Sequence, residues 1–328
     1  MRNPGEVSTD VSAAPTLSIV VVVYRMPRQA MNTLHSLSAQ HQRAADPASY
    51  EVVVVENLSD RCLEPGAVDT LAPNFRYLVR EESGVSPASA LNAGIGLARG
   101  DCIGLMIDGA RMVTPGLVGQ VLAAFRAFPQ SLVAAPGYDL GPDQQQRSGV
   151  AGYDEAAEAE LLGRVDWKRD GYRLFEIACF SPANRNGYMT PLMECGCLFC
   201  PRAALDLIGG VDERFESRGG GMVNLDLYRG LASLSSLQLV VLPGEGSFHQ
   251  FHGGVTSGGL REREAVVRAF QEEYRALRGA PFKAPRREPV LFGRVPTPAL
   301  PFLQASTESA LLRAKRLAAN PQPLWEDG

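Results

Sequence analysis

Two of the four histidines of the chain stand three residues apart in the segment SFHQFHGG, residues 247–254. Imidazole is a common metal ligand near neutral pH, but a histidine can equally be an ordinary packed side chain. In an extended strand, residues three apart point to opposite faces, so His249 and His252 could hold one ion only if the chain turns between them. The Gly253-Gly254 pair would permit such a bend. The segment alone leaves a ligand role and a packing role open.

Polar side chains also follow three apolar segments that have the length and composition of buried strands. These segments are residues 17–23 (LSIVVVV), 51–57 (EVVVVEN) and 102–107 (CIGLMI). The polar side chains at or just after their ends are Tyr24, Arg25, Glu56, Asn57 and Asp108. In a parallel sheet, ligands bind beyond the carboxyl ends of the strands. We therefore expect these side chains to lie on one rim and to contact a ligand.

Segments with helical spacing alternate with these strands over the first 135 residues. Pro27, Ser86-Pro87 and Thr114-Pro115 mark helix starts, and Gly100 stands where a glycine commonly closes a helix. Such alternation predicts an α/β fold with a mostly parallel central sheet flanked by helices. Further predicted elements are strands at 75–79, 131–135, 193–200 and 237–242, and helices at 155–162, 201–208, 261–278 and 306–319.

The composition is that of a soluble globular protein, with 45% hydrophobic and 21% charged residues. The formal net charge of −4 gives no indication of a nucleic-acid partner. No apolar run reaches the roughly 20 residues that span a bilayer, and the polar N-terminus does not resemble a secretory signal. We expect the six cysteines, three of them in CGCLFC at 195–200, to be free structural thiols, which favours a cytoplasmic location.

Two other nucleotide-binding classes are disfavoured. The segment GIGLARG at 94–100 has the wrong spacing for a G-x-G-x-x-G dinucleotide motif, and it ends a predicted helix instead of following a strand. The sequence contains no P-loop motif. A nucleotidyltransferase usually has a glycine-rich loop after its first strand, whereas the corresponding VVYRMPRQ contains no glycine.

From about residue 16 to residue 255, the chain resembles a GT-A glycosyltransferase of the family 2 type. The segment 17–40 resembles the first strand and helix of that family, and YEVVVVENLSD resembles its second strand with V-D-N-x-S-x-D. The stretch 84–118 resembles the part that reaches the metal-binding D-x-D. GGVDERFESRGGGMVNLDLYRGL resembles G-G-F-D-E-x-F…G-G-E-D-x-D-L…R. The order of the four segments is more specific than any one of them.

The resemblance implies transfer of a sugar from a nucleoside-diphosphate sugar donor, with Mn²⁺ or Mg²⁺ neutralising the leaving diphosphate. Asp108 matches the first Asp of the D-x-D, but Ala110 stands where the second is expected. The family often takes a further ligand, commonly His, from a later segment, where His249 and His252 lie. We expect one of the two to bind the metal and the other to brace the loop. Arg111 could instead neutralise phosphate directly.

The resemblance also implies which residues contact the donor and which act on the acceptor. The implied donor contacts are Val23, Tyr24, Arg25, Glu56, Asn92, Asp108 and Arg111. An inverting enzyme, the outcome we expect, needs a carboxylate to take the proton of the acceptor. Asn224 stands where that carboxylate is expected, and it also resembles retaining relatives with G-G-E-N-x-E. Asp226 and Glu194 remain as candidate bases.

The predicted organisation is an arm, one domain and an extension. Residues 1–15 are a disordered arm, and residues 16–260 are a GT-A domain with a nucleotide-binding half (16–136) and an acceptor and metal half (137–260). Residues 261–328 are a helical, proline-rich C-terminal extension.

The broken D-x-D and Asn224 also allow a nucleotide-sugar-binding protein that has lost catalysis. Turnover in the presence of Mn²⁺ would distinguish this rival from an active transferase. The nucleobase, the sugar, the acceptor and the oligomeric state have no recognisable signature. A thermal-shift panel of UDP, GDP, dTDP and CDP, with and without Mn²⁺, would test the donor class and the metal dependence together.

Overall fold

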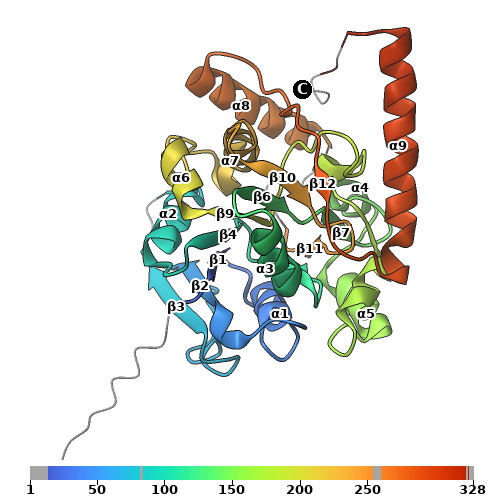
Figure 1. The fold of residues 1–328 in the computed structure, drawn as a ribbon. Helices are drawn as coiled ribbons and strands as arrows, with labels where there is room; N and C mark the ends of the chain where they lie inside the picture. Colours follow the sequence, from blue (N-terminus) through green and yellow to red (C-terminus); the bar gives the residue numbers. More distant parts are fainter. Residues whose placement is uncertain (1–13, 82–83, 254–259, 323, 325–328) are drawn as a thin grey trace, which may run out of the picture.

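The computed structural model describes residues 14–81, 84–253, 260–322 and 324. The arm predicted for residues 1–15 lies outside these ranges except for its last two residues. Figure 1 shows the helices packed around a central sheet, with the C-terminal helix α9 along one side.

The central sheet has eight strands in the order β12-β10-β6-β9-β4-β1-β2-β3. The bounds are Leu17–Val23 (β1), Tyr50–Asn57 (β2), Phe75–Arg80 (β3), Cys102–Met106 (β4), Ser131–Ala134 (β6), Leu198–Pro201 (β9), Gln238–Val241 (β10) and Val290–Leu291 (β12). Strand β9 runs antiparallel to both of its neighbours, and the other adjacent pairs are parallel. The prediction of an α/β fold with a mostly parallel sheet is confirmed.

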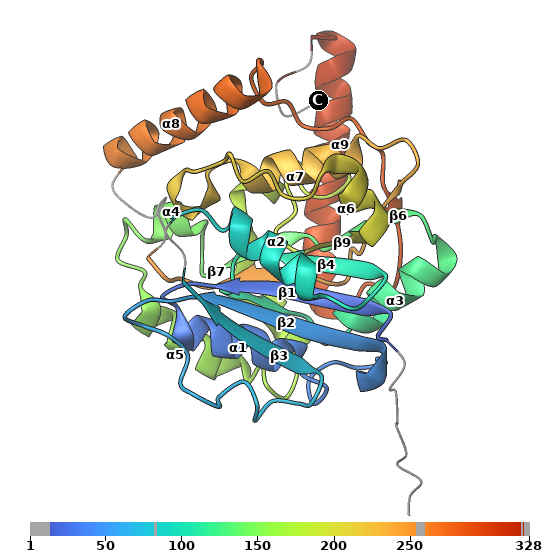
Figure 2. The ribbon, with the colours of Figure 1, turned by 90° about the vertical axis from the view of Figure 1, so that its left-hand side faces the viewer.

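Helices cover both faces of this sheet, as its apolar strands require. Every residue of β1 and β2 is buried. One core packs the sheet against α1 (Pro27–Leu37) and α3 (Leu117–Ala127). The other packs it against α2 (Ala88–Leu97), α6 (Arg202–Ile208) and α7 (Val223–Ala232), and Figure 2 shows these two layers. The carboxyl ends of β1, β2 and β4 therefore meet at one edge.

A smaller sheet carries the second part of the polar chemistry. Its order is β5-β11-β7-β8, with bounds Arg111–Val113 (β5), Ser247–His249 (β11), Gly137–Leu140 (β7) and Ala178–Phe180 (β8). The register places Met112, Phe248, Tyr138 and Phe180 in one row. The next row consists of Arg111, His249, Asp139 and Cys179. Because side chains alternate between the faces of a sheet, the two rows lie on opposite faces.

The apolar row anchors this sheet. The ring of Tyr138 stacks on Phe248 and Phe180 at centroid distances of 5.2 and 5.3 Å. Phe302 packs edge-on against Tyr138 at 4.8 Å. Such aromatic contacts stabilise a fold by more than the apolar area that they bury would account for. They therefore hold the polar row on the other face of the sheet in a fixed position.

Helix α2 differs from its predicted bounds. It begins at Ala88 with Pro87 as the capping residue and ends at Leu97, so Gly100 does not close it. Gly100 lies against β1, where a Cβ would be 2.8 Å from the main-chain nitrogen of Ser18. The glycine therefore permits a close approach of two backbones.

The C-terminal segment contributes to the body of the fold. It contains α8 (Leu260–Arg278), β12 and α9 (Leu300–Ala319). The proline-rich stretch 281–301, which gave no strand signal in the sequence, supplies β12, and β12 pairs with β10. Figure 1 shows α9 standing beside the small sheet at its lower end. The segment predicted as a helical, proline-rich extension thus contributes β12 to the central sheet and Phe302 to the aromatic core.

Two further helices and five 3₁₀ turns complete the regular elements of the described residues. They are α4 (Gln145–Ser148), α5 (Glu155–Val165) and 3₁₀ turns at Pro47–Ser49, Gly171–Ile177, Pro182–Asn184, Arg218–Gly220 and Thr297–Ala299. Within the part of the chain that the structure describes, no helix combines the length and the apolar character needed to cross a membrane.

Two glycines of α2 provide a matched test of how this helix packs on the sheet. A Cβ at Gly94 would lie 2.3 Å from Cγ1 of Val20, whereas a Cβ at Gly96 meets no atom within 4 Å. We expect Gly94→Ala to lower the free energy of unfolding by about 2 kcal/mol through overpacking. Gly96→Ala should raise it by up to about 1 kcal/mol through helix propensity. Urea unfolding followed by circular dichroism measures both, and equal effects would contradict this packing.

Candidate metal and donor site

Asp108 lies in the loop that follows β4, at the carboxyl edge of the central sheet. Its Oδ1 accepts a hydrogen bond from the N–H of Ala110 at 2.9 Å, which closes a tight turn. Gly109 allows this turn to lie against β1, because a Cβ there would be 2.8 Å from the carbonyl oxygen of Val22. The turn occupies Oδ1 and directs Oδ2 toward the histidine segment.

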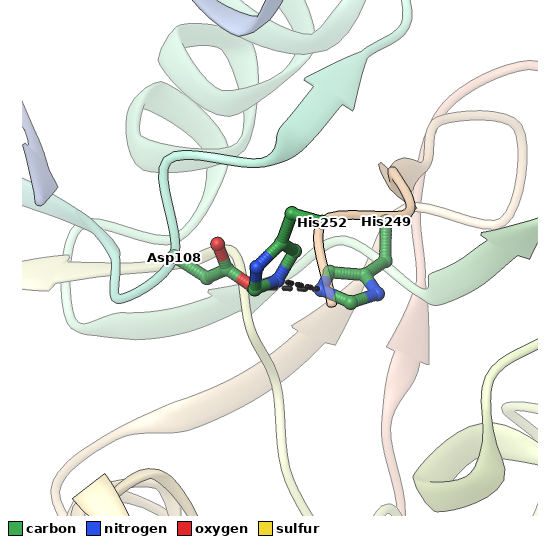
Figure 3. Close-up of side chains that lie close together, drawn as sticks. All are labelled: Asp108, His249 and His252. Carbon is green, nitrogen blue, oxygen red and sulfur yellow. Dashed lines mark hydrogen bonds and ion pairs between the residues drawn. The ribbon is translucent and has the colours of Figure 1, made fainter. Parts of the chain in front are cut away.

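Both histidines face Asp108, as Figure 3 shows. Oδ2 of Asp108 lies 2.7 Å from Nε2 of His249 and 3.5 Å from Nε2 of His252. The two Nε2 atoms are 3.1 Å apart. Both imidazoles face this point because β11 ends at His249 and the chain then turns back.

These three side chains fit a divalent cation. Each offers one ligand atom, and the three atoms lie within 4.8 Å of one another. Neighbouring ligands of an octahedral ion with bonds of about 2.1 Å are roughly 3.0 Å apart. The 3.1 Å between the imidazole nitrogens matches that spacing. A set of two nitrogens and one oxygen suits a transition-metal ion better than Mg²⁺, which prefers oxygen ligands.

The electrostatics of the three residues are coupled. Burial alone would raise the pKa of Asp108, but His252 and His249 outweigh it and hold that pKa well below its usual range. Burial would likewise lower the pKa of His252, but the Asp108 carboxylate raises it above its ordinary value. The carboxylate is therefore charged, and a divalent ion would compete with an imidazole proton for the same atoms.

Glu158 of α5 holds the turn that carries the histidines. Its carboxylate accepts hydrogen bonds from the N–H of Phe251 at 2.6 Å and from Arg28 at 3.2 Å. The side chain of Glu158 has no exposed surface. Burial raises its pKa to about 7, although these two partners act in the opposite direction.

Arg111 and Asp139 flank His249 in the polar row. Asp139 is buried, and its Oδ2 accepts a hydrogen bond from the N–H of Gln145 at 3.0 Å. Burial raises the pKa of Asp139, while His249 and Arg111 lower it. The Arg111 guanidinium lies against Gly196, where a Cβ would be 2.7 Å from Cζ. Its Nε is buried and has no hydrogen-bond partner among the described residues.

Glu194 belongs to the same cluster of charges. It lies in a loop, not in the strand predicted from residue 193, because β9 begins only at Leu198. Its Oε2 accepts a hydrogen bond from Nδ2 of Asn224 at 3.0 Å. Burial raises the pKa of Glu194, and Arg111 and the Asn224 bond oppose this. The structure thus pairs Glu194 with the asparagine that replaces the expected carboxylate.

Asp226, the other predicted base, has a different environment. Both of its carboxylate oxygens accept hydrogen bonds from Arg278 of α8, at 2.7 and 2.6 Å. Arg278 also binds Asp212 at 2.8 Å. These residues line a cavity of about 920 Å³ whose lining does not include the three metal-donor residues. The geometry makes Asp226 an anchor for α8 and gives no support to a role as base.

Glu56 does not present its carboxylate to a nucleoside. Its side chain is buried and accepts hydrogen bonds from the N–H of Leu63 at 3.1 Å and from the hydroxyl of Tyr77. Burial raises the pKa of Glu56 despite both bonds. These bonds brace the loop after β2, and they give the predicted donor contact of this side chain no support.

The end of β1 keeps an exposed rim. Tyr24 is 46% exposed, and Arg25 forms an ion pair with Asp60 at 3.0 Å. Arg25 has a φ of 58°, a left-handed conformation that is uncommon outside glycine. Val23 is fully buried in the core, so its side chain is not available to a donor as predicted.

Asn92 likewise has a structural partner set. Its amide donates to the carbonyl of Val211 at 2.9 Å and accepts from the N–H of Val211 at 3.0 Å. It also donates to Glu213 at 2.7 Å. Asn92 therefore fastens α2 to the segment after α6, and the predicted donor contact has no support.

Two residues of the site were missed in the sequence. Asp60 lies in the segment ENLSD but was not singled out, and it replaces Glu56 as the exposed carboxylate near Tyr24 and Arg25. Asp139 lies in the strand GYDL between Tyr138 and Leu140. The alternation of a carboxylate with large apolar residues could have identified Asp139, because this pattern is typical of a strand with one polar face.

With this geometry established, the chain can be compared with known proteins. Residues 18–175 match the family described as Glycosyl transferase family 2. No curated protein sequence matches the chain significantly. The match includes Asp108, Arg111 and Asp139. Glu194, His249 and His252 lie beyond it.

Two solved structures have partial similarity to the fold. S. aureus TarS 1–349 in complex with UDP-GlcNAc gives a TM-score of 0.48 at 14% identity over 79% of this chain and 66% of that chain. The mannosyltransferase PcManGT from Pyrobaculum calidifontis in complex with GDP-Man and Mn²⁺ gives 0.43 at 17% identity over 98% and 80%. The chain thus spans 66% of that TarS chain.

Residues 18–175 match glycosyl transferase family 2, and the α/β fold with its mostly parallel central sheet is the one that the resemblance to GT-A enzymes predicted. The matched segment identifies a glycosyltransferase domain. It contains β1, β2 and β4, whose carboxyl ends form the rim that carries Asp108.

The buried carboxylate of Glu158 predicts a pH-dependent stability. The native chain keeps this proton up to about pH 7, whereas an unfolded glutamate loses it near its ordinary pKa of 4.5. The native state therefore binds more protons between these values, and stability falls as the pH rises from about 5 to 7. We expect Glu158→Gln to flatten this part of the profile, because the amide does not titrate but can still accept from Phe251.

Urea unfolding at several pH values measures this effect. Glu160→Gln is the matched control in the same helix, since Glu160 is exposed and pairs with Arg164 on the surface. The control should keep the wild-type profile. Identical profiles for wild type and Glu158→Gln would contradict the assignment.

Proposed function

We propose that the chain is a metal-dependent glycosyltransferase that moves a sugar from a nucleoside-diphosphate sugar to a hydroxyl of an acceptor. The observation that carries this proposal is the convergence of Asp108, His249 and His252 at the carboxyl edge of the sheet. These residues come from two segments 141 positions apart and meet where α/β folds bind ligands. The match of residues 18–175 to glycosyl transferase family 2 supports the same reaction class.

Asp108, His249 and His252 would hold the cation, for which Mn²⁺ is our first candidate. Bound there, a divalent ion would neutralise the charge that develops on the leaving diphosphate. Arg111 lies beside His249 in the polar row and brings a permanent positive charge. We assign its guanidinium to an oxygen of the diphosphate, because Arg111 pairs with His249 across β5 and β11 beside the proposed metal site.

Glu194 is our candidate for the general base. The bond from Asn224 orients its carboxylate, and burial raises its pKa, which strengthens it as a proton acceptor. The proton of the acceptor hydroxyl would pass to Glu194 as that oxygen attacks the sugar. A base acting in a single displacement corresponds to inversion at the sugar carbon, the stereochemistry that we propose.

For the nucleoside, we propose the exposed rim at the end of β1. Tyr24 offers an aromatic face on which a base could stack, and Asp60 offers a carboxylate to the base or the ribose. The ion pair with Asp60 keeps Arg25 at the same rim. Uracil is the first nucleobase to test, and the acceptor class stays open.

We propose that the protein acts in the cytoplasm. All six cysteines are free thiols, which agrees with a reducing compartment. The formal net charge of −4 gives no support to a nucleic-acid partner.

The metal site can be tested by substitution and by chelation. We expect Asp108→Asn, His249→Ala and His252→Ala each to lower Mn²⁺-dependent turnover by at least about 100-fold, because charge neutralisation at the leaving group is lost. EDTA should abolish wild-type turnover, and added Mn²⁺ should restore it. Release of UDP, GDP, dTDP or CDP from the corresponding sugar donors is the readout.

Unchanged turnover of Asp108→Asn would refute the proposed metal site. Thermal shift with the four nucleoside diphosphates and Mn²⁺ serves as the control for binding. Stabilisation by one of them without turnover of any donor would favour the rival, a nucleotide-sugar-binding protein without catalysis.

The assignment of the base has a matched pair of variants. Glu194→Gln keeps the shape but cannot take a proton, so we expect kcat to fall by about 10² to 10⁴ while donor affinity is retained. Asp226→Asn should leave kcat near wild type and lower the melting temperature, because it weakens the bonds to Arg278. Steady-state kinetics and calorimetry measure both. The opposite pattern would identify Asp226 as the base.

A further inference from the structure

We propose that Gln250, the residue after His249, is a positioning residue that sets the spacing of the two imidazoles before a cation binds. The inference rests on the proposed function and deepens it by naming what holds the metal donors in place. Gln250 does not touch the reacting atoms. It acts through the backbone of the histidine segment and of the turn that carries Asp108.

The side chain of Gln250 is fully buried and bonded through both of its polar atoms to α1. Nε2 donates to the carbonyl of Gln29 at 2.9 Å and to the hydroxyl of Thr33 at 3.2 Å. Oε1 accepts from Nδ2 of Asn32 at 2.9 Å. A buried amide whose nitrogen and oxygen are both hydrogen-bonded cannot turn without leaving a polar atom unpaired. Gln250 is therefore fixed with respect to α1.

The backbone of Gln250 joins this amide to the other half of the site. Its N–H donates to the carbonyl oxygen of Ala110 at 2.8 Å. Ala110 also donates its own N–H to Asp108, so one residue links the carboxylate turn to the histidine segment. Position 110 is where a second aspartate of a D-x-D would stand, and here its side chain is fully buried in the apolar core. The position contributes its main-chain atoms instead of a carboxylate.

The neighbouring peptides are held in the same manner. Nε2 of Gln29 donates to the carbonyl of Phe251 at 2.7 Å, and Glu158 accepts from the N–H of Phe251. Nε2 of Gln145 donates to the carbonyl of His249 at 2.7 Å. Side chains from α1, α4 and α5 thus bond the backbone between the two imidazoles. The turn that brings His252 back toward His249 is imposed by these bonds.

This arrangement has a consequence for metal affinity. A site with one carboxylate and two neutral imidazoles attracts a divalent ion less strongly than a site with two carboxylates. Donors already held 3.1 Å apart need little ordering when the ion arrives, and affinity gained through preorganisation offsets the missing charge. Loss of a supporting hydrogen bond behind metal ligands typically lowers affinity by about 10–100-fold.

The test compares two buried glutamines that both bond to the α1 region. Gln250→Met keeps the length of the side chain and removes its hydrogen bonds. Gln42→Met is the control, because Gln42 donates to the carbonyls of Ser36 and Thr114 and accepts from the N–H of Val118, away from the donor atoms. Mn²⁺ alone is titrated into each full-length variant by isothermal calorimetry, and the melting temperature is measured beside it.

We expect Gln250→Met to weaken Mn²⁺ binding by about 10–100-fold and Gln42→Met to bind Mn²⁺ as wild type does, although both lower the melting temperature. Asn32→Ala, which removes a single bond to Gln250, should give an intermediate Mn²⁺ affinity and serves if Gln250→Met does not fold. Equal affinities of the Gln250, Asn32 and Gln42 variants would overturn the positioning role. Absence of Mn²⁺ binding by the folded wild type would instead overturn the proposed metal site itself.

Discussion

The pairing of β11 with β5 on one side and β7 on the other is the constraint on which the polar chemistry of this protein depends. Phe248 fills the aromatic core from one face of β11, so His249 must emerge on the other face beside Arg111 and Asp139. A slip of one residue in this register would exchange the two faces. Three short strands thus determine which charges surround the candidate metal site.

Much of the fold and part of the site followed from sequence pattern. Buried strands with helices between them predicted the parallel sheet, and the rule for strand ends placed Asp108 at the ligand-binding edge. The convergence of both histidines did not follow, because it depends on β11 ending at His249, and a three-residue strand leaves almost no periodic signal. The prediction from strand periodicity holds only while the chain stays extended. In the structure, side chains from three helices bend the chain between His249 and His252.

Three of the predicted site residues have structural partners, for a reason that they share. Glu56, Asn92 and Asp226 have the residue types expected of donor or acceptor contacts, yet each is bonded to a partner that the sequence could not reveal. The partner of Asp226 is Arg278, 52 positions away on α8. A polar side chain that bonds a buried backbone group or forms an ion pair can be the same residue type as one that contacts a substrate. Only tertiary contacts distinguish the two.

The two edges of the central sheet bear on how the chain avoids self-association. An unpaired edge strand can add a strand from another molecule and so begin aggregation. At one edge, β3 places Arg76 and Arg80 along its length, and burying these charges against a second sheet would be unfavourable. At the other edge, β12 pairs with β10 and so covers that strand. Because β12 is only two residues long and follows Pro289, it offers almost no backbone for pairing with a strand of another molecule. The outermost strands thus offer little free backbone to a second molecule, and the sheet is protected at both edges against pairing with another copy of the chain.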